Sequence, residues 1–305
     1  MAPLFSVMIP TYNCANYLEK TLESVLSQDM GEEMMQIEVI DDCSTKDNPE
    51  EVVERLGKGR VQFFRHPKNV GAIKNFNECI KRSKGKLVHI LHGDDFVLDG
   101  FYKEYAACAE KHPDAFLIYC DTMGVNESGA FMYDMGLQST HVGVTKDVSE
   151  IMYNNRICFP CVVIRKEAFD QLGGFNEVLS HCADWEMWVR VISKLGGIQI
   201  QKQLCCYRDF DNSHSATVKR SAVNVKEYEK TFEIFASYNI GLDEKLVLKR
   251  LKHVSLFQYY NFKEKGDLEA AKNNLDYYLS KASVFEKAKI LIKDKIILPG
   301  KKVSK

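Results

Sequence analysis

The chain has 305 residues, 45% of them hydrophobic and 27% charged, a composition typical of a globular protein and unlike that of a disordered one. Its formal net charge of -1 gives no general attraction to polyanions, so we expect no nucleic-acid partner. No run of about 18 consecutive apolar residues occurs, which excludes a membrane-spanning helix. The length fits one large domain with a smaller appendage.

The amino terminus enters a strand pattern directly, without the basic region and apolar stretch of a signal peptide, so we expect a cytoplasmic protein. The ten cysteines are scattered and many lie in apolar runs, as reduced core thiols do. Cys158 and Cys161 have CxxC spacing, but no second pair has matching spacing and residues 158–164 resemble a strand. Zinc binding or redox use is therefore the less favoured interpretation of this pair.

Strand and helix patterns alternate through the first 91 residues. The expected strands span residues 4–9, 36–40, 61–64 and 86–91. The expected helices span residues 16–28, 49–56 and 69–84. This order predicts an α/β fold with a mostly parallel sheet that helices cover on both faces.

Polar residues follow three of these strands. Pro10-Thr-Tyr-Asn13 closes the first, Asp41-Asp42 the second, and Asp94-Asp95 the fourth. Ligands of open α/β sheets bind at the carboxyl ends of the strands, and carboxylates suit Mg2+ or Mn2+. We therefore expect a metal-dependent site for a phosphorylated ligand; the alternative is that Gly93-Asp94-Asp95 is only a polar turn.

The glycine-rich phosphate loops are absent. No GxGxxG follows the first strand and no GxxxxGK[ST] occurs in the chain. This argues against a dinucleotide-dependent dehydrogenase and against a P-loop NTPase. It favours a diphosphate that is held by a metal ion.

Several segments together resemble the GT-A family 2 glycosyltransferases, over roughly residues 4–217. They are Ser6-Val-Met-Ile-Pro-Thr-Tyr-Asn13, Asp41-Asp42-x-Ser-Thr45, Asn69-x-Gly71 with Lys74 and Asn75, Gly85-Lys86, and His92-Gly-Asp-Asp95. The resemblance implies a GT-A, Rossmann-like fold and inverting sugar transfer from a nucleoside diphosphate. It implies nucleotide contacts from Pro10, Tyr12, Asn13, Asp42, Lys74 and Asp94, and metal ligation by Asp94 and Asp95. At position 92, where many members have another Asp, this chain has His.

The middle of the chain continues the alternation of elements. The expected elements are a helix at 99–111, strands at 115–119, 161–165 and 204–208, and helices at 166–176 and after Asp184. Residues 121–148 are rich in Gly, Ser and Thr, which favours a loop-bearing hairpin at a substrate opening.

Asp184 is the candidate general base, since inverting transfer needs a carboxylate to take the acceptor hydroxyl's proton. It begins a helix, so simple N-terminal capping is the alternative role. The family's Glu/Asp-Asp-x-Glu-x-Trp element, to which Ala183-Asp-Trp-Glu186 is similar, assigns the base to Asp184, and Glu186 is the second candidate. Ala183 stands where the family usually has an acid.

A family histidine near the last strand is also replaced. Tyr207-Arg208-Asp209-Phe210 is similar to the family's Tyr-Arg-x-His, with Phe210 at the His position. His214 is a candidate substitute as a metal or diphosphate ligand. An ordinary solvated loop histidine is an equally good interpretation.

Four helices are expected at the carboxyl end, at residues 225–238, 243–263, 267–280 and 284–298. We therefore divide the chain into a GT-A domain at 1–218 and a helical region at 219–305. The last helix mixes lysines with a broad aliphatic face, which suits peripheral contact with an anionic membrane. Docking on the other helices is the alternative.

These features predict an inverting glycosyltransferase that uses Mn2+ or Mg2+ and a UDP-sugar, or alternatively a dTDP-sugar. The expected acceptor is a saccharide or a polyprenyl-linked saccharide, as in surface polysaccharide assembly. The Gln-x-x-Arg-Trp element of processive synthases is absent, which favours single additions. The alternatives are a sugar-1-phosphate nucleotidyltransferase and a non-catalytic nucleotide-sugar-binding protein.

Overall fold

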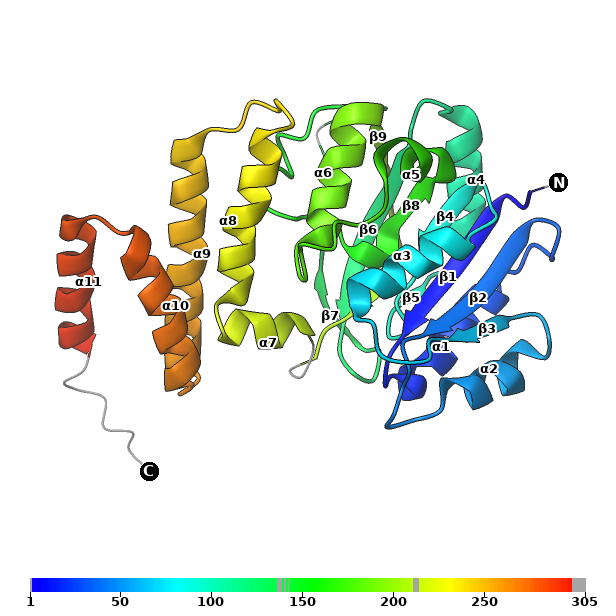
Figure 1. Cartoon of the computed structure of the whole chain (residues 1–305), viewed down its shortest axis with the longest axis horizontal. Helices are drawn as coiled ribbons and strands as arrows, with labels where there is room; N and C mark the ends of the chain where they lie inside the picture. The colour runs from blue at the N-terminus through cyan, green and yellow to red at the C-terminus, as the bar shows by residue number, and fades with distance from the viewer. Residues whose placement is uncertain (1, 136–138, 140, 142, 211–213, 298–305) are drawn as a thin grey trace. The chain divides into compact units, whose positions relative to one another are not determined.

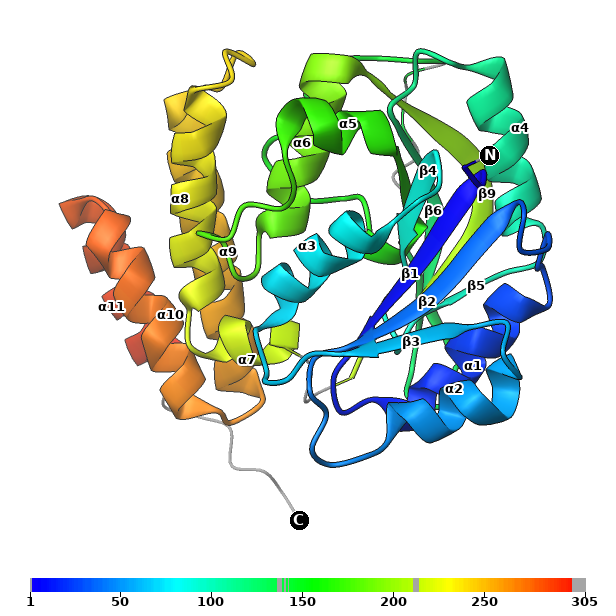
Figure 2. The ribbon, with the colours of Figure 1, turned by 45° about the vertical axis from the view of Figure 1, so that its right-hand side comes forward.

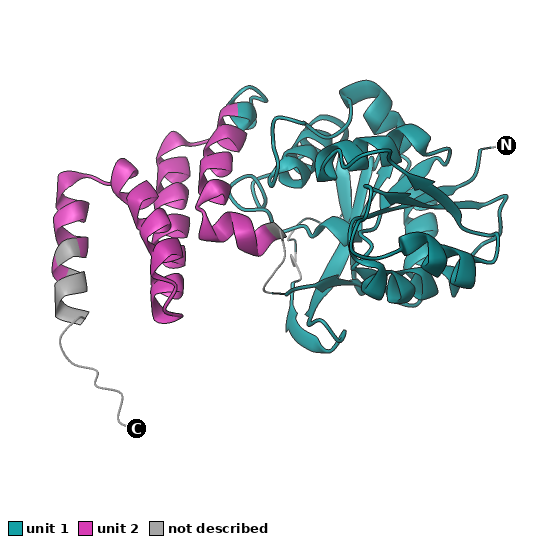
Figure 3. Cartoon of the chain, turned by 60° about the horizontal axis from the view of Figure 1, so that its bottom comes forward, with its two compact units in different colours: residues 1–211, 234–240 teal, residues 212–233, 241–305 magenta. Residues whose placement is uncertain are grey.

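A computed structural model of the chain describes residues 2–135, 139, 141, 143–210 and 214–297. The chain divides into two compact units. The first comprises Met1–Asp211 and Ile234–Ile240, and the second comprises Asn212–Glu233 and Gly241–Lys305 (Figure 3). The expected boundary after residue 218 falls within α7 (His214–Arg220).

The first unit carries the strands and six of the described α-helices (Figure 1). The strands are β1 (Phe5–Thr11), β2 (Met35–Asp41), β3 (Gln62–Arg65), β4 (Leu87–Ile90), β5 (Phe96–Val97), β6 (Leu117–Val125), β7 (Phe131–Asp134), β8 (Val162–Arg165) and β9 (Gly197–Arg208). The helices are α1 (Ala15–Leu26), α2 (Pro49–Gly57), α3 (Ala72–Arg82), α4 (Phe101–Lys111), α5 (Lys166–Leu172) and α6 (Ala183–Leu195), with a 3-10 turn, η1, at Phe159–Cys161.

Within the described residues the strands form one sheet, in the order β3-β2-β1-β4-β8-β6-β9-β5, and β7 pairs with β6. The first half is parallel, as the sequence predicts: β1 pairs in parallel with both β2 and β4, and β2 with β3. Every residue of β1 and β2 is buried, which is typical of parallel strands covered on both faces.

The second half of the sheet is mixed: β6 and β9 form a long parallel pair, and shorter antiparallel pairs join the other strands. The prediction of a mostly parallel sheet therefore holds for the longest pairings, and the antiparallel pairs are the departure from it. Strand β8 runs antiparallel to both β4 and β6, and β5 runs antiparallel to β9. Strand β9 begins at Gly197, well before the expected residue 204, because it pairs in parallel with β6 along its whole length. The CxxC segment is not a strand: η1 precedes β8.

Helices cover both faces of the sheet (Figures 1 and 2). Right-handed β-α-β connections place α1 and α2 on one face of the parallel half, and the return connection through α3 crosses to the other. As a result, the strand order reverses direction between β1 and β4. Such a switch point is where open α/β sheets bind ligands.

The second unit is helical. It contains α7, most of α8 (Val223–Ala236), α9 (Glu244–Glu264), α10 (Leu268–Lys281) and α11 (Val284–Ile297). Helix α7 was not expected from the sequence. Asp267 caps α10 by accepting a hydrogen bond from the Ala270 N–H. Among the described helices, none combines the length and apolar character that crossing a membrane requires.

Candidate functional site

The carboxyl end of β1 joins the three polar segments that the sequence singles out. The Pro10 carbonyl accepts a hydrogen bond of 3.0 Å from the Gly93 N–H, and the Thr11 carbonyl accepts one of 2.9 Å from the Asp42 N–H. Pro10 itself is a buried residue of β1. Tyr12 follows directly and is 48% exposed, so its ring is available for stacking on a ligand.

Asn13 builds the loop beside Tyr12. Its backbone adopts a left-handed conformation with φ of 53°, and its side-chain oxygen accepts hydrogen bonds from the Thr45 and Lys46 N–H groups. Its own N–H donates to the Ser44 hydroxyl. Asn13 thus ties the loop after β1 to the loop after β2, which aligns the two segments expected to contact the nucleotide.

Asp42 fixes the loop that precedes α3. Its two carboxylate oxygens accept hydrogen bonds of 2.7 Å from Val70 N–H and 2.9 Å from Gly71 N–H, and the residue is only 3% exposed. Gly71 has a φ of 89°, which favours glycine. Lys74 lies exposed in the first turn of α3, the helix that Gly71 caps. Because Asp42 binds the Gly71 N–H, Asp42 and Lys74 lie on adjoining segments at the carboxyl edge of the sheet.

The acidic pair lies after β4 and is held from three sides. Thr21 of α1 donates hydrogen bonds to the carbonyls of Gly93 and Asp95. Arg208, at the end of β9, donates its backbone N–H to Asp95 Oδ1 at 2.8 Å and its guanidinium Nε–H to the Asp94 carbonyl at 2.8 Å. A Cβ on Gly93 would lie 3.2 Å from the Thr11 side chain, so only glycine lets this turn approach β1 so closely.

The acidic pair has features that suit a cation. Asp95 is 1% exposed, yet its Oδ2 has no hydrogen-bond partner, which is costly for a buried carboxylate. Burial, followed by the charge of Asp95, raises the pKa of Asp94. A divalent ion would compensate both carboxylates. The residues present therefore fit the metal that the sequence predicts, with Asp94 and Asp95 to hold it.

His92 is a residue of this site whose importance sequence reasoning missed. Its Nδ1 lies 3.5 Å from Asp95 Oδ2. Burial lowers the pKa of His92, but the nearby carboxylates of Asp95, Asp94 and Asp184 outweigh burial and raise it. The acidic pair and the candidate base Asp184 therefore both act electrostatically on the His92 imidazole. The departure from the family's Asp at this position was the available signal.

Asp184 lies in the first turn of α6 and is partly buried. Its Oδ2 accepts a hydrogen bond of 2.9 Å from Asn155 Nδ2, and its Oδ1 accepts one of 2.6 Å from the Trp185 N–H. Burial raises its pKa to about 6 and outweighs these hydrogen bonds. A carboxylate with this pKa is still ionised at pH 7 and is a stronger base than an exposed Asp.

Glu186, the second candidate for the base, is engaged elsewhere. It is 1% exposed, forms an ion pair of 2.8 Å with Arg190, and accepts a short hydrogen bond from the Tyr238 hydroxyl. A carboxylate that already carries a guanidinium and a phenol partner is poorly suited to accept a substrate proton. The geometry therefore favours Asp184 over Glu186.

The position of the missing family histidine is filled by an aromatic contact. Phe210 stacks on Tyr17 of α1 with ring centroids 5.8 Å apart. His214 begins α7, but its side chain lies outside the described residues, so its expected ligand role stays a prediction.

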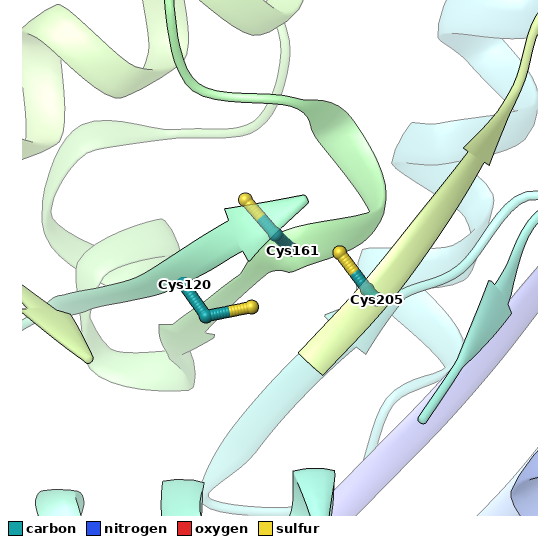
Figure 4. Close-up of side chains that lie close together, drawn as sticks. All are labelled: Cys120, Cys161 and Cys205. Carbon is teal, nitrogen blue, oxygen red and sulfur yellow. The ribbon is translucent and has the colours of Figure 1, made fainter. Parts of the chain in front are cut away.

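The cysteines group differently from the CxxC interpretation. Cys161 lies beside Cys120 and Cys205 (Figure 4), and the three sulfurs lie within 4.8 Å of one another. Cys205 also contacts the Thr122 hydroxyl at 3.2 Å. Burial raises the pKa of Cys120 and Cys205 well above that of a free thiol. They are protonated core thiols at neutral pH, and all ten cysteines are free.

Comparison with known proteins decides the family. Residues 6–173 match the model of "Glycosyl transferase family 2". The chain belongs to this family. The resemblance of the sequence segments is thereby confirmed, and Asp42, Asp94 and Asp95 fall within the matched residues, whereas Asp184 and Glu186 lie beyond them.

Curated relatives of this family 2 chain include polysaccharide synthases. The hyaluronan synthase of Pasteurella multocida is 24% identical over 305 residues, covering 98% of this chain and 28% of the relative. The chondroitin synthase of Escherichia coli is 24% identical and covers 75% of this chain and 32% of the relative. The chain thus spans about a third or less of the length of these two synthases.

Solved structures of similar fold are glycosyltransferases, and the chain shares their GT-A fold. Staphylococcus aureus TarS, residues 1-349 in complex with UDP-GlcNAc, has a TM-score of 0.63 and 22% identity, covering 92% of this chain and 82% of TarS. The mannosyltransferase PcManGT from Pyrobaculum calidifontis, in complex with GDP-Man and Mn2+, has a TM-score of 0.58 and 14% identity, covering 98% and 81% of the two chains.

Proposed function

We propose that this family 2 chain is an inverting, non-processive glycosyltransferase with a nucleoside-diphosphate sugar as donor. UDP-sugars are the first candidates, because TarS is described in complex with UDP-GlcNAc, and dTDP-sugars are the second. Saccharides, free or polyprenyl-linked, are the proposed acceptors. Membership of a glycosyltransferase family favours sugar transfer over the nucleotidyltransferase alternative. The observation that carries the proposal is the convergence of Asp94, Asp95 and Asp184 on His92.

The donor is proposed to bind along the carboxyl ends of β1, β2 and β4. The exposed Tyr12 ring supports the base by stacking, next to Pro10 and Asn13. Asp42, whose carboxylate already orients Val70 and Gly71, has remaining lone pairs for a base N–H. Lys74 supplies a positive charge for the diphosphate, and Asp94 accepts from the ribose or binds the metal.

Asp184 is the proposed general base. It accepts the proton of the acceptor hydroxyl while that oxygen bonds to the donor's anomeric carbon, and the bond from this carbon to the diphosphate oxygen breaks. Mg2+ or Mn2+ held by Asp94 and Asp95 would supply positive charge to the departing diphosphate. Asn155 and the Trp185 N–H hold the Asp184 carboxylate in one orientation, so the proton acceptor is preorganised.

The experiment that tests this function is a donor panel. Purified protein with Mn2+ or Mg2+ is incubated with UDP-, GDP- and dTDP-sugars, with and without saccharide acceptors, and products are measured by mass spectrometry. We expect release of a nucleoside diphosphate and a product of inverted anomeric configuration. Binding of nucleotide without hydrolysis or transfer from any donor would instead support the non-catalytic alternative.

Helix α11 is the proposed site of peripheral contact with an anionic membrane. Val284, Phe285 and Ile292 are 84%, 78% and 60% exposed, and Lys287 and Lys289 are exposed beside them. Apolar and basic side chains on one exposed helix suit an anionic lipid surface. We expect Phe285→Asp to reduce co-sedimentation with phosphatidylglycerol vesicles, and Phe257→Asp on α9, where the phenylalanine is 63% exposed, is the matched control. Equal loss in both variants would argue against a specific role for α11.

A further inference from the structure

The ring of His92 packs against a pair of neighbouring aromatic side chains. Phe159 of η1 stacks on it with centroids 4.2 Å apart and planes 29° apart, and Phe76 of α3 with centroids 5.2 Å apart and planes 20° apart. Phe76 and Phe159 also contact each other, with centroids 4.9 Å apart. The imidazole is therefore held in one plane, and its Nδ1 edge is directed at the acidic pair.

The distance between His92 and Asp95 is unusual for a hydrogen bond. Nδ1 lies 3.5 Å from Asp95 Oδ2, beyond the usual range of about 2.7–3.2 Å for a nitrogen donor and an oxygen acceptor. Asp95 Oδ2 has no hydrogen-bond partner although it is buried, while Oδ1 accepts from the Arg208 N–H. One oxygen of Asp95 is thus fixed by the fold and the other is left facing the imidazole.

A shared metal ion explains this separation. Ligands at about 2.0–2.2 Å from one ion lie roughly 3.0–3.5 Å from each other at angles between octahedral and tetrahedral. Asp94 contributes a third candidate atom, since ligand atoms of His92, Asp94 and Asp95 lie within 4.8 Å of one another. The three residues come from one turn after β4, and that turn is held by Thr21 and Arg208.

We propose that His92 is a nitrogen ligand of the divalent metal and makes the site prefer a transition-metal ion to Mg2+. This inference rests on the proposed function of the same site. Mg2+ takes oxygen ligands almost exclusively, whereas imidazole suits later first-row ions such as Co2+ and Zn2+ better. An Asp at position 92 gives an all-oxygen site, and His92 converts it to a mixed nitrogen and oxygen site.

The test measures metal selectivity on the full chain. Mn2+ and Mg2+ binding are measured by titration calorimetry and Mn2+ electron paramagnetic resonance, each with and without UDP, and Co2+ binding by its visible absorption. The variants are His92→Asp and His92→Gln, with His253→Gln, an exposed histidine of α9, as the control. Thermal unfolding establishes that each variant is folded.

We expect the ratio of Co2+ to Mg2+ affinity to fall about 10-fold or more in both His92 variants, the scale on which ligand-sphere changes act. His92→Asp should retain Mg2+ binding, and His253→Gln should match the unchanged chain. The Co2+ absorption bands should shift in His92→Gln, because a nitrogen ligand is lost.

Two results would overturn the inference. Equal weakening of Mg2+ and Co2+ in His92→Gln, with unchanged Co2+ bands, would mean that His92 only positions Asp95. Unchanged affinities for all ions would remove it from the metal site. Either result with sugar transfer intact leaves the proposed function standing, whereas metal binding without turnover from any donor would contradict the proposed function and not the ligand assignment.

Discussion

Buried acids in the first unit fall into two groups that the fold treats differently. Along α3 and α6, Glu38 pairs with Arg82 at 2.5 Å and Glu186 with Arg190 at 2.8 Å. At the carboxyl edge, the buried Asp95 and the partly buried Asp94 and Asp184 have no ion pair with a lysine or arginine of the described chain, and the titratable side chain near all three is His92.

The two groups of acids differ in the role we expect of them: those with a guanidinium partner stabilise the fold, and those without one are available to a ligand. A buried acid with a guanidinium partner is neutralised when the chain folds, and it has no affinity left for a ligand. A buried acid without such a partner keeps an electrostatic cost that a substrate cation or proton can remove. The unpaired acids are therefore the ones we assign to metal binding and proton transfer.

The largest effect is expected at Asp184. Asp184→Asn keeps the size of the side chain but removes the base, so kcat should fall by about 10²-fold or more. Donor affinity should stay nearly unchanged, because Asp184 acts on the acceptor. Steady-state kinetics and UDP binding measure the two quantities, and an unchanged kcat would place Asp184 among the structural acids.

Substitution in the acidic pair should reduce metal-dependent nucleotide binding. Asp95→Ala is expected to abolish metal-dependent nucleotide binding, since it removes the oxygen that has no other partner. Calorimetry with UDP in the presence and absence of Mn2+ measures this effect. If metal-dependent binding survives in Asp95→Ala and is lost in Asp94→Ala, Asp94 alone holds the ion and Asp95 only shapes the turn.

Substitution of Glu186 should lower the free energy of unfolding and leave kcat unchanged. Glu186→Gln leaves the buried Arg190 without its carboxylate, and breaking such a pair costs about 3 kcal/mol of unfolding free energy. Urea unfolding measures this loss. At temperatures where the variant is still folded, its kcat should be retained. A kcat that falls as far as in Asp184→Asn, with stability unchanged, would transfer the role of base to Glu186.

The smallest effect concerns pH. Because the pKa of Asp184 is raised to about 6, kcat/KM should fall as the pH is lowered through about 6, where the base becomes protonated. Asn155→Ala removes a hydrogen bond that lowers this pKa, so the acid limb should move to higher pH. If the acid limb does not move in Asn155→Ala, then either Asn155 does not affect the pKa of Asp184 or the group that limits turnover at low pH is not Asp184.

Much of the carboxyl edge of the sheet could be predicted, because it depends on local sequence. Alternating strands and helices define β1 to β4, and polar residues directly after a strand must lie at the carboxyl edge. Tyr12, Asp42, Asp94 and Asp95 were found in this way. The family resemblance, rather than spacing, identified Asp184.

The features missed depend on pairing between distant segments. The early start of β9 at Gly197 and the roles of Arg208 follow from its pairing with β6, about which the local residue pattern is uninformative. The grouping of Cys161 with Cys120 and Cys205 likewise needs three neighbouring strands. The position of His92 beside Asp95 and against Phe76 and Phe159 likewise depends on the folded arrangement of separate segments.

Arg208 links the acidic pair to a more distant part of the sheet. Besides the Asp94 carbonyl, its guanidinium donates to the carbonyls of Asn126 and Glu127, at the tip of the β6–β7 hairpin. A single side chain thereby couples the turn that carries Asp94 and Asp95 to the conformation of a hairpin loop. We expect substitutions at that tip to displace this turn even when every residue proposed to contact the donor is unchanged.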